Sequence, residues 1–251
     1  MKVEVEVRDG VRTVRLNRAD KRNALDPEML AALTEAFPHA PDAAERLAVL
    51  RAEGGVFCAG LDLTTRRELS ASAESSIEAT LHAVAAYPLP VVAVVQGPAI
   101  AGGCELALHA DIVVASTAAR FAMPLVQIGL APTWHLTNKL LELAGPAVTR
   151  QILMLGDAIS AERLAALGLI AAAVPPDQLL SAAAAVVERL AANAPLSLRA
   201  VKAVIGRGMS FRDPIAHGDV DAMVLKAVHS ADAKEGRTAR AEKRPPRFTG
   251  A

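Results

Sequence analysis

Two glycine-rich segments carry the residues of this 251-residue chain whose types and spacing could do chemistry. The first, FCAGLDL at residues 57–63, places an aspartate two positions after a glycine. The second places Gly102-Gly103 before a predicted helix and Glu105 in the first turn of that helix. A glycine pair at a helix start exposes backbone N–H groups without intrahelical acceptors, and the helix dipole favours negative charge there. The pattern indicates an oxyanion hole beside a carboxyl group, although a tight turn followed by a first-turn glutamate would read the same way.

Other site chemistries find little support in the sequence. No Gly-Lys-Ser/Thr follows the glycines as in a P-loop, and Gly102-Gly103 lacks the third glycine of a dinucleotide fingerprint. Cys58 and Cys104 are too few for a disulfide framework, and no Cys or His spacing suggests zinc. We therefore expect no metal ion and no separate cofactor.

Composition excludes several classes of protein. Hydrophobic residues are 52% and charged residues 22%, which excludes a disordered chain. Lys+Arg 27 equals Asp+Glu 27, and aromatic residues are 3%, so neither the basic surface nor the stacking rings of a nucleic-acid binder are present. The most apolar stretch, 83–95, is broken by prolines and too short for a bilayer, and the charged N-terminus does not resemble a signal peptide. We expect a soluble cytoplasmic protein without nucleic-acid or membrane partners.

Hydropathy patterns predict the elements that position the two segments. Alternating valines on both sides of Asp9-Gly10 predict a β-hairpin, and Asp26 before a proline predicts a helix start. The aliphatic runs 91–95 and 112–115 predict fully buried parallel strands joined by a crossover helix. A further strand is predicted at 47–51, and helices at 76–87, 137–144, 147–155, 160–168, 177–192 and 195–206. The fold class is therefore α/β, with a body at 1–194 and a helical C-terminal region at 195–251.

Six segments, in this order, resemble the crotonase (enoyl-CoA hydratase/isomerase) superfamily. They are RNAL at 22–25, FCAGLDL at 57–63, PLPVVAVVQG at 88–97, AGGCELAL at 101–108, ADIVVA at 110–115, and the tail 235–248. The resemblance covers almost the whole chain. It implies a crotonase-like spiral of ββα turns at 1–194 and a C-terminal helical trimerisation region at 195–251. It further implies an acyl-CoA thioester as substrate, coenzyme A being part of that substrate, and a homo-trimer or a hexamer built as a dimer of trimers.

The resemblance also implies roles for individual residues. The N–H groups of Leu61 and Gly102 would hold the thioester oxygen, and Glu105 would act as acid/base. Ala101 stands where the family has the first of three glycines. The substrate-binding positions implied are Ala24, Ala59, Gly60, Leu61, Asp62, Gly102, Leu125 and Trp134.

The chain departs from the family pattern at the second catalytic position. Family hydratases carry a second glutamate after a proline, and here that position is Leu125, which can neither hold nor deprotonate water. Trp134, the only tryptophan, is expected to narrow the acyl pocket, and the adjacent His135 is more typical of a structural residue. Three functions remain open: an enoyl-CoA hydratase-like lyase, which we favour, a single-base enoyl-CoA isomerase, and a non-catalytic acyl-CoA-binding protein.

Overall fold

A computed structural model of the chain describes the backbone of residues 1–62 and 71–251 and the side chains of 1–62 and 76–251. Leu63, the last residue of the first glycine-rich segment, lies outside the described residues.

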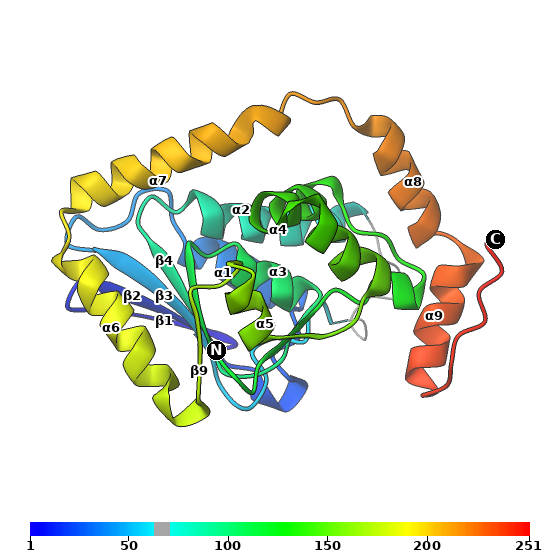
Figure 1. The fold of residues 1–251 in the computed structure, drawn as a ribbon, viewed down its shortest axis with the longest axis horizontal. Coiled ribbons are helices and arrows are strands. Elements are labelled where there is room, and N and C mark those ends of the chain that lie inside the picture. Colours follow the sequence, from blue (N-terminus) through cyan, green and yellow to red (C-terminus); the bar gives the residue numbers. More distant parts are fainter. Residues whose placement is uncertain (63–70) are drawn as a thin grey trace. The chain divides into compact units, whose positions relative to one another are not determined.

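A six-stranded sheet forms the centre of the fold (Figure 1). Its strands, in spatial order, are β1 (Val3–Arg8), β2 (Val11–Leu16), β3 (Leu47–Ala52), β4 (Val91–Val95), β6 (Ile112–Ser116) and β9 (Ala172–Val174). The β1 and β2 strands pair antiparallel, and each later neighbour pairs parallel. Asp9 and Gly10 both have positive φ, 50° and 76°, as a two-residue hairpin turn requires. The predicted hairpin and buried strands are confirmed.

A second, three-stranded sheet contains β5 (Ala99–Ile100), β7 (Arg120–Ala122) and β8 (Ile159–Ser160). A parallel bridge between Cys58 and Ala99 joins the segment after β3 to this sheet. The chain thus passes from a strand of the large sheet to a short strand or bridge and then to a helix, and repeats this course. That course is the predicted spiral of ββα turns.

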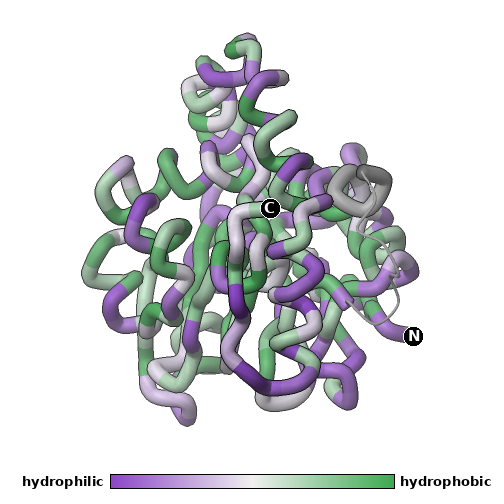
Figure 2. The backbone as a smooth tube through the Cα atoms, turned by 90° about the vertical axis from the view of Figure 1, so that its right-hand side faces the viewer, coloured by the Kyte–Doolittle hydropathy of each residue, from purple (hydrophilic) through white to green (hydrophobic). Residues whose placement is uncertain are grey.

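Helices cover both faces of the large sheet. The nine helices that the structure describes are α1 (Pro27–Ala36), α2 (Ala71–Ala86), α3 (Gly102–Leu108), α4 (Trp134–Leu155), α5 (Ala161–Ala166), α6 (Leu179–Ala192), α7 (Pro195–Met209), α8 (Gly218–Val228) and α9 (Ala231–Ala241). On one face, Leu179 and Ala183 of α6 pack on alternate residues of β3, β4 and β6. On the opposite face, α2 packs on both α1 and α3 (Figure 1). Because β4 is covered on both faces, it consists only of aliphatic residues. Figure 2 shows the hydropathy of each residue along the backbone, with hydrophobic residues in green.

Two predicted N-caps are confirmed, whereas α2 begins five residues earlier than predicted, at Ala71, and α6 begins two residues later, at Leu179. The Asp26 carboxylate accepts from the Met29 N–H at 2.9 Å, and the Ser160 hydroxyl accepts from the N–H of the third residue after it. The two helices predicted at 137–144 and 147–155 are confirmed, because α4 consists of two helices that meet at a kink at Gly145, whose φ of 64° is not helical. The first of them begins three residues earlier than predicted because the Thr133 side chain caps the Leu136 N–H.

The chain divides into two compact units by its contacts. The first unit contains Met1–Phe121 and Ile159–Ser210, and the second contains Ala122–Ala158 and Phe211–Ala251. The sequence-based boundary at residue 194, between an acyl-CoA-binding body and an oligomerisation region, stays a prediction.

No single described helix is long and apolar enough to cross a bilayer. One pair, Pro176–Ala192 and Pro195–Arg212, meets the length and composition requirement jointly but is bent by 105°.

Candidate active site

Gly60 and Gly102 bring the two glycine-rich segments into backbone contact within the first unit. A Cβ atom on Gly60 would lie 2.8 Å from the Ile100 carbonyl oxygen and 3.2 Å from the Gly102 nitrogen, and its φ is +85°. A Cβ atom on Gly102 would lie 2.6 Å from Cδ1 of Ile77. The close approach of the two backbones therefore depends on Gly60, while a side chain at Gly102 would displace the end of Ile77.

The N–H groups of Leu61 and Gly102 are the two predicted donors. Leu25 donates its N–H to the Gly60 carbonyl at 2.8 Å and accepts from the Asp62 N–H at 2.9 Å. In such a bridge the residue between the two bonded groups directs its own N–H to the opposite side, so the Leu61 N–H points away from Leu25. Gly102 is the first residue of α3, and its N–H has no acceptor within the helix. Neither the bridge nor the helix therefore uses these two N–H groups, and their role as donors to a substrate oxygen stays a prediction.

Glu105 lies in the first turn of α3, on the side of Gly102. Its Oε2 atom lies 3.7 Å from the position that a Cβ would take on Gly102. Burial raises the pKa of Glu105 to about 7, and the negative charge of Glu78 on α2 adds to the rise. A carboxyl group with this pKa is present in both protonation states near neutral pH, as a general acid/base requires.

Ala101 adopts a backbone conformation that favours glycine. Ala101 directly precedes the first residue of α3, and it has a φ of 50° and a ψ of −121°. A non-glycine residue in such a region costs about 1–3 kcal/mol. The departure from the family pattern at this position therefore leaves a strained residue beside the Gly102 donor.

A buried network that the sequence analysis did not single out joins the segment at 22–25 to the first glycine-rich segment. The fully buried Asn23 side chain donates to the carbonyls of Glu53 and Val56 at 2.8 Å each and accepts from the Arg18 N–H at 2.9 Å. The carbonyl before it accepts from the Ala59 N–H at 3.1 Å. Ala24 and Ala59, both predicted substrate-binding positions, therefore lie on loops that are held together.

Asp62 pairs with a residue 44 positions earlier in the chain. Its buried carboxylate accepts from Nη1 of Arg18 at 2.7 Å. The only feature of the sequence that could have indicated this role of Arg18 is its place, as a charged residue, just after a strand.

Leu125 and Trp134 belong to the second unit. Leu125 precedes a 3₁₀ turn at Val126–Ile128, and its carbonyl accepts from the Leu130 N–H at 2.9 Å. The Trp134 ring stacks on the His217 ring with centroids 4.9 Å apart, and Nδ1 of His217 lies 2.6 Å from Asp221 Oδ2. Trp134 is therefore a packed residue of its unit, and its expected place against an acyl chain stays a prediction.

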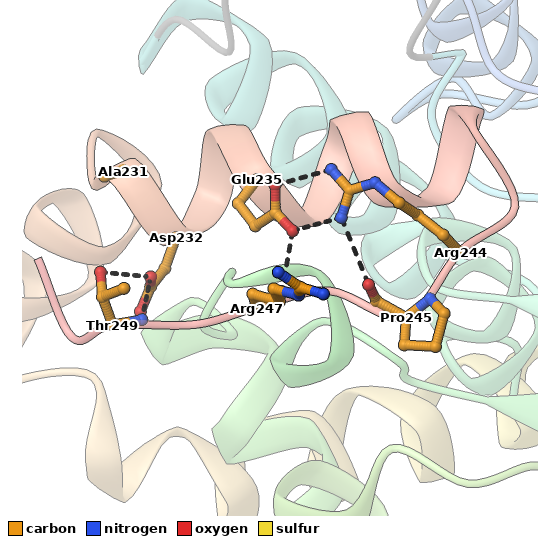
Figure 3. Close-up of a pocket in the computed structure, with 7 residues that line it drawn as sticks. All are labelled: Ala231, Asp232, Glu235, Arg244, Pro245, Arg247 and Thr249. Atoms are coloured by element: carbon orange, nitrogen blue, oxygen red, sulfur yellow. Dashed lines mark hydrogen bonds and ion pairs between the residues drawn. The ribbon is translucent and has the colours of Figure 1, made fainter.

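The tail closes onto α9 around a cavity of about 590 Å³ (Figure 3). The Glu235 carboxylate accepts from both terminal nitrogens of Arg244, at 2.5 and 2.9 Å, and from the Arg247 N–H at 2.9 Å. The hydrogen bonds from Arg244, and then that from Arg247, lower the pKa of Glu235 to about 2. Asp232 accepts from the N–H of Thr249 at 2.7 Å. These charges fasten the tail, so the tail motif has a structural use within the second unit.

Within the described residues, no group of three or more His, Cys, Asp or Glu side chains could hold a metal ion.

Comparison with known proteins decides the family. A profile described as enoyl-CoA hydratase/isomerase matches residues 6–251. The chain belongs to this family. (E)-Benzylidenesuccinyl-CoA hydratase of Thauera aromatica is 34% identical over all of both chains. Crotonyl-CoA hydratase of Syntrophomonas wolfei subsp. wolfei is 31% identical over 97% of this chain and 96% of its own.

Solved structures of the crotonase family share the fold. An enoyl-CoA hydratase of Mycobacterium avium subsp. paratuberculosis K-10 superposes with a TM-score of 0.88 at 29% identity, covering 99% of both chains. A methylmalonyl-CoA decarboxylase superposes with a TM-score of 0.90 over 100% of this chain and 99% of its own, but at 23% identity this likeness concerns the fold alone. The crotonase-like α/β fold predicted from the sequence is confirmed.

Proposed function

We propose that the protein is an enoyl-CoA hydratase-like enzyme that reversibly adds water to 2-trans-enoyl-CoA thioesters. The observation that carries this proposal is the Glu105 carboxyl group, with a pKa of about 7, beside Gly102 at the start of α3. The full-length similarity to CoA-ester hydratases supports the same reaction class.

The two N–H groups provide the electrophilic half of the mechanism. Addition of water to the β-carbon moves electron density onto the thioester oxygen, and donors aimed at that oxygen stabilise the enolate. Losing one donor of this kind typically costs about 3–4 kcal/mol of transition-state stabilisation. The Leu61 and Gly102 donors need no side chain, so they are compatible with any acyl group that the pocket admits.

Glu105 provides the proton transfers. Its ionised form takes a proton from water as the oxygen attacks the β-carbon, and its protonated form returns a proton to the α-carbon. A pKa near the working pH lets one carboxyl group do both steps, and a placed acid/base contributes about 10²–10⁴ in rate.

Leu125 sets a limit on the hydration rate. If it occupies the place of the second family glutamate, only one carboxyl group orients and activates the water, and hydration is slower by about 10²–10⁴ unless another group substitutes. A double-bond shift needs only one base. Enoyl-CoA isomerisation is therefore the second candidate activity, with Glu105 as the base that moves the proton.

The remaining parts of the site follow from the same proposal. Residues Ala24, Ala59, Gly60, Asp62, Leu125 and Trp134 would contact the coenzyme A and acyl parts of the substrate. We further propose a homo-trimer or dimer of trimers in the cytoplasm that needs no metal ion and no cofactor other than the substrate's coenzyme A.

The test is the loss of enoyl-thioester absorbance with crotonyl-CoA, using Glu105→Gln and the matched variant Glu78→Gln. Glu105→Gln keeps the side-chain shape but removes the titrating group, so turnover should fall by about 10² or more while acyl-CoA affinity stays nearly constant. Glu78→Gln should stay active and move the acidic limb of the pH–rate profile to lower pH, because it removes a charge that raises the pKa of Glu105. Full turnover in Glu105→Gln would contradict the proposal.

Product analysis separates the two candidate reactions. Leu125→Glu should raise hydration if the pocket admits water between two carboxyl groups. If Leu125→Glu has no effect and Glu105→Gln abolishes the interconversion of 2- and 3-enoyl-CoA, the isomerase is the correct assignment.

A further inference from the structure

We propose that Arg18 is a positioning residue for the thioester clamp, holding the Leu61 N–H in place by tying the Asp62 carboxylate to the Ala24 carbonyl. This inference rests on the proposed function, because it assigns Arg18 a purpose at the same site.

The Arg18 guanidinium connects two loops through one nitrogen atom. Its Nη1 donates to Asp62 Oδ2 at 2.7 Å and to the Ala24 carbonyl at 2.8 Å, and lies 3.5 Å from Asp26 Oδ2. The Arg18 side chain is 14% exposed and that of Asp62 6%. Because both charges are largely withdrawn from water, removing the cation is more costly than at a surface ion pair.

The two acceptors flank the backbone bridge that orients the Leu61 N–H. Ala24 directly precedes Leu25, and Asp62 directly follows Leu61, while the bridge itself pairs Leu25 with Leu61. Arg18 therefore contacts both strands of the bridge, one strand before the bridged pair and the other after it. Rotation of the Leu61 peptide group would have to break either the bridge or the guanidinium contacts.

Arg18 is itself fixed to the large sheet. It follows β2 by two residues, its N–H donates to the buried Asn23 side chain, and its carbonyl accepts from the Asn23 N–H at 2.9 Å. The position of the Leu61 N–H is thereby fixed relative to the rigid sheet rather than relative to a loop. Displacement of a reacting group by 1 Å can cost about 10²-fold in rate, so fixing this N–H group contributes to catalysis.

Arg12 offers a matched control for structural effects. It lies on β2, its side chain is also 14% exposed, and it donates to the buried Glu45 carboxylate at 2.6 and 2.7 Å. Glu45 is held by Tyr87 and by the Asp42 N–H, all away from the glycine-rich segments. Loss of the Arg12 ion pair should therefore weaken the fold without altering the clamp.

The experiment compares Arg18→Met with Arg12→Met in the full chain. For each protein we would measure kcat and KM on crotonyl-CoA, the melting temperature, and the affinities for butyryl-CoA and S-butyl-CoA. The second ligand is a thioether without a carbonyl oxygen, so the ratio of the two affinities reports the clamp and cancels changes in coenzyme A binding.

We expect Arg18→Met to lower kcat by about 10–10²-fold and to abolish most of the preference for butyryl-CoA. Arg12→Met should keep kcat and the affinity ratio despite a comparable loss of melting temperature. If Arg18→Met does not fold, Asp62→Asn takes its place and should change both quantities in the same direction. Where both fold, the double variant should lose no more than the larger single variant.

Unchanged kcat and affinity ratio in Arg18→Met, or in Asp62→Asn if the first does not fold, would overturn the inference, and so would an equal loss in Arg12→Met. Failure of the proposed function looks different. A wild-type protein that prefers the thioester but does not hydrate crotonyl-CoA contradicts only the hydratase, and the affinity ratio still tests Arg18. A wild-type protein without that preference overturns the clamp and the role of Arg18 together.

Discussion

The surroundings of the Glu105 carboxyl group act against its ionisation, although it lies at a helix start. The helix dipole stabilises a carboxylate in the first turn and would lower the pKa. Burial and the charge of Glu78 prevail here and raise the pKa to about 7. The folded protein therefore holds a proton that the unfolded chain releases near its ordinary pKa of 4.5.

This difference predicts a pH-dependent effect of Glu105→Gln on stability. A raised carboxyl pKa gives full stability below 4.5 and lowers the free energy of unfolding as the pH rises from 4.5 to 7. The glutamine variant lacks this loss, so it should be more stable than wild type by on the order of 2 kcal/mol at pH 8 and by less at pH 5. Urea unfolding of both proteins at both pH values measures this difference in the free energy of unfolding. An equal difference at both pH values would show that Glu105 ionises normally.

Site residues differ in how far the sequence could predict them. Gly102 and Glu105 stood out because they are close in sequence at a predicted helix start, although a tight turn alone gives the same local pattern. Arg18 did not, because its partner Asp62 is 44 residues away and nothing local marks the pair. Buried ion pairs between loops depend on the tertiary fold, which no window of sequence contains.

At the start of α3, helix geometry and residue type disagree. Ala101 precedes the helix with φ 50° and ψ −121°, and its Cβ lies near the position that a Cβ on Gly60 would take. Ala101→Gly should relieve this strain. The expected gain is about 1 kcal/mol, the strain removed exceeding the extra entropy of an unfolded glycine. Thermal unfolding measures the gain, and a lower melting temperature for Ala101→Gly would show that the alanine is not strained.

Elements with a strong pattern were predicted and short ones were not. The Asp9-Gly10 hairpin and the aliphatic run of β4 carry clear signals, and both were predicted at nearly their observed bounds. The β5, β7 and β8 strands have two or three residues, too few to show a period, and exist because the spiral brings them together. The kink of α4 was predicted as well, because Gly145 is a stop signal in the sequence and has a non-helical conformation in the structure.

The surface of the first unit suggests how whole molecules associate. None of the residues of α7 is buried, although Val201, Val204 and Ile205 repeat at helical spacing and are 55%, 71% and 59% exposed. An apolar helix face left in water is typical of an association surface. This face supports the proposed trimer.

Light scattering tests that proposal. The wild-type protein should have three or six times the chain mass of 26.1 kDa, and Val204→Asp should shift it toward the monomer, because a charge would be buried in the contact. Val5→Asp, on the half-exposed outer face of β1, is the control and should keep the wild-type mass. A monomeric wild-type protein would refute the association.

The stack of Trp134 on His217 also gives the molecule a built-in optical label. Trp134 is the only tryptophan, so excitation at its absorption edge reports a single location, the contact between the first turn of α4 and the residue before α8. His217 is in turn paired with Asp221, so the indole has a defined polar neighbour. The emission wavelength of the unlabelled protein will therefore show whether a bound acyl chain reaches that ring.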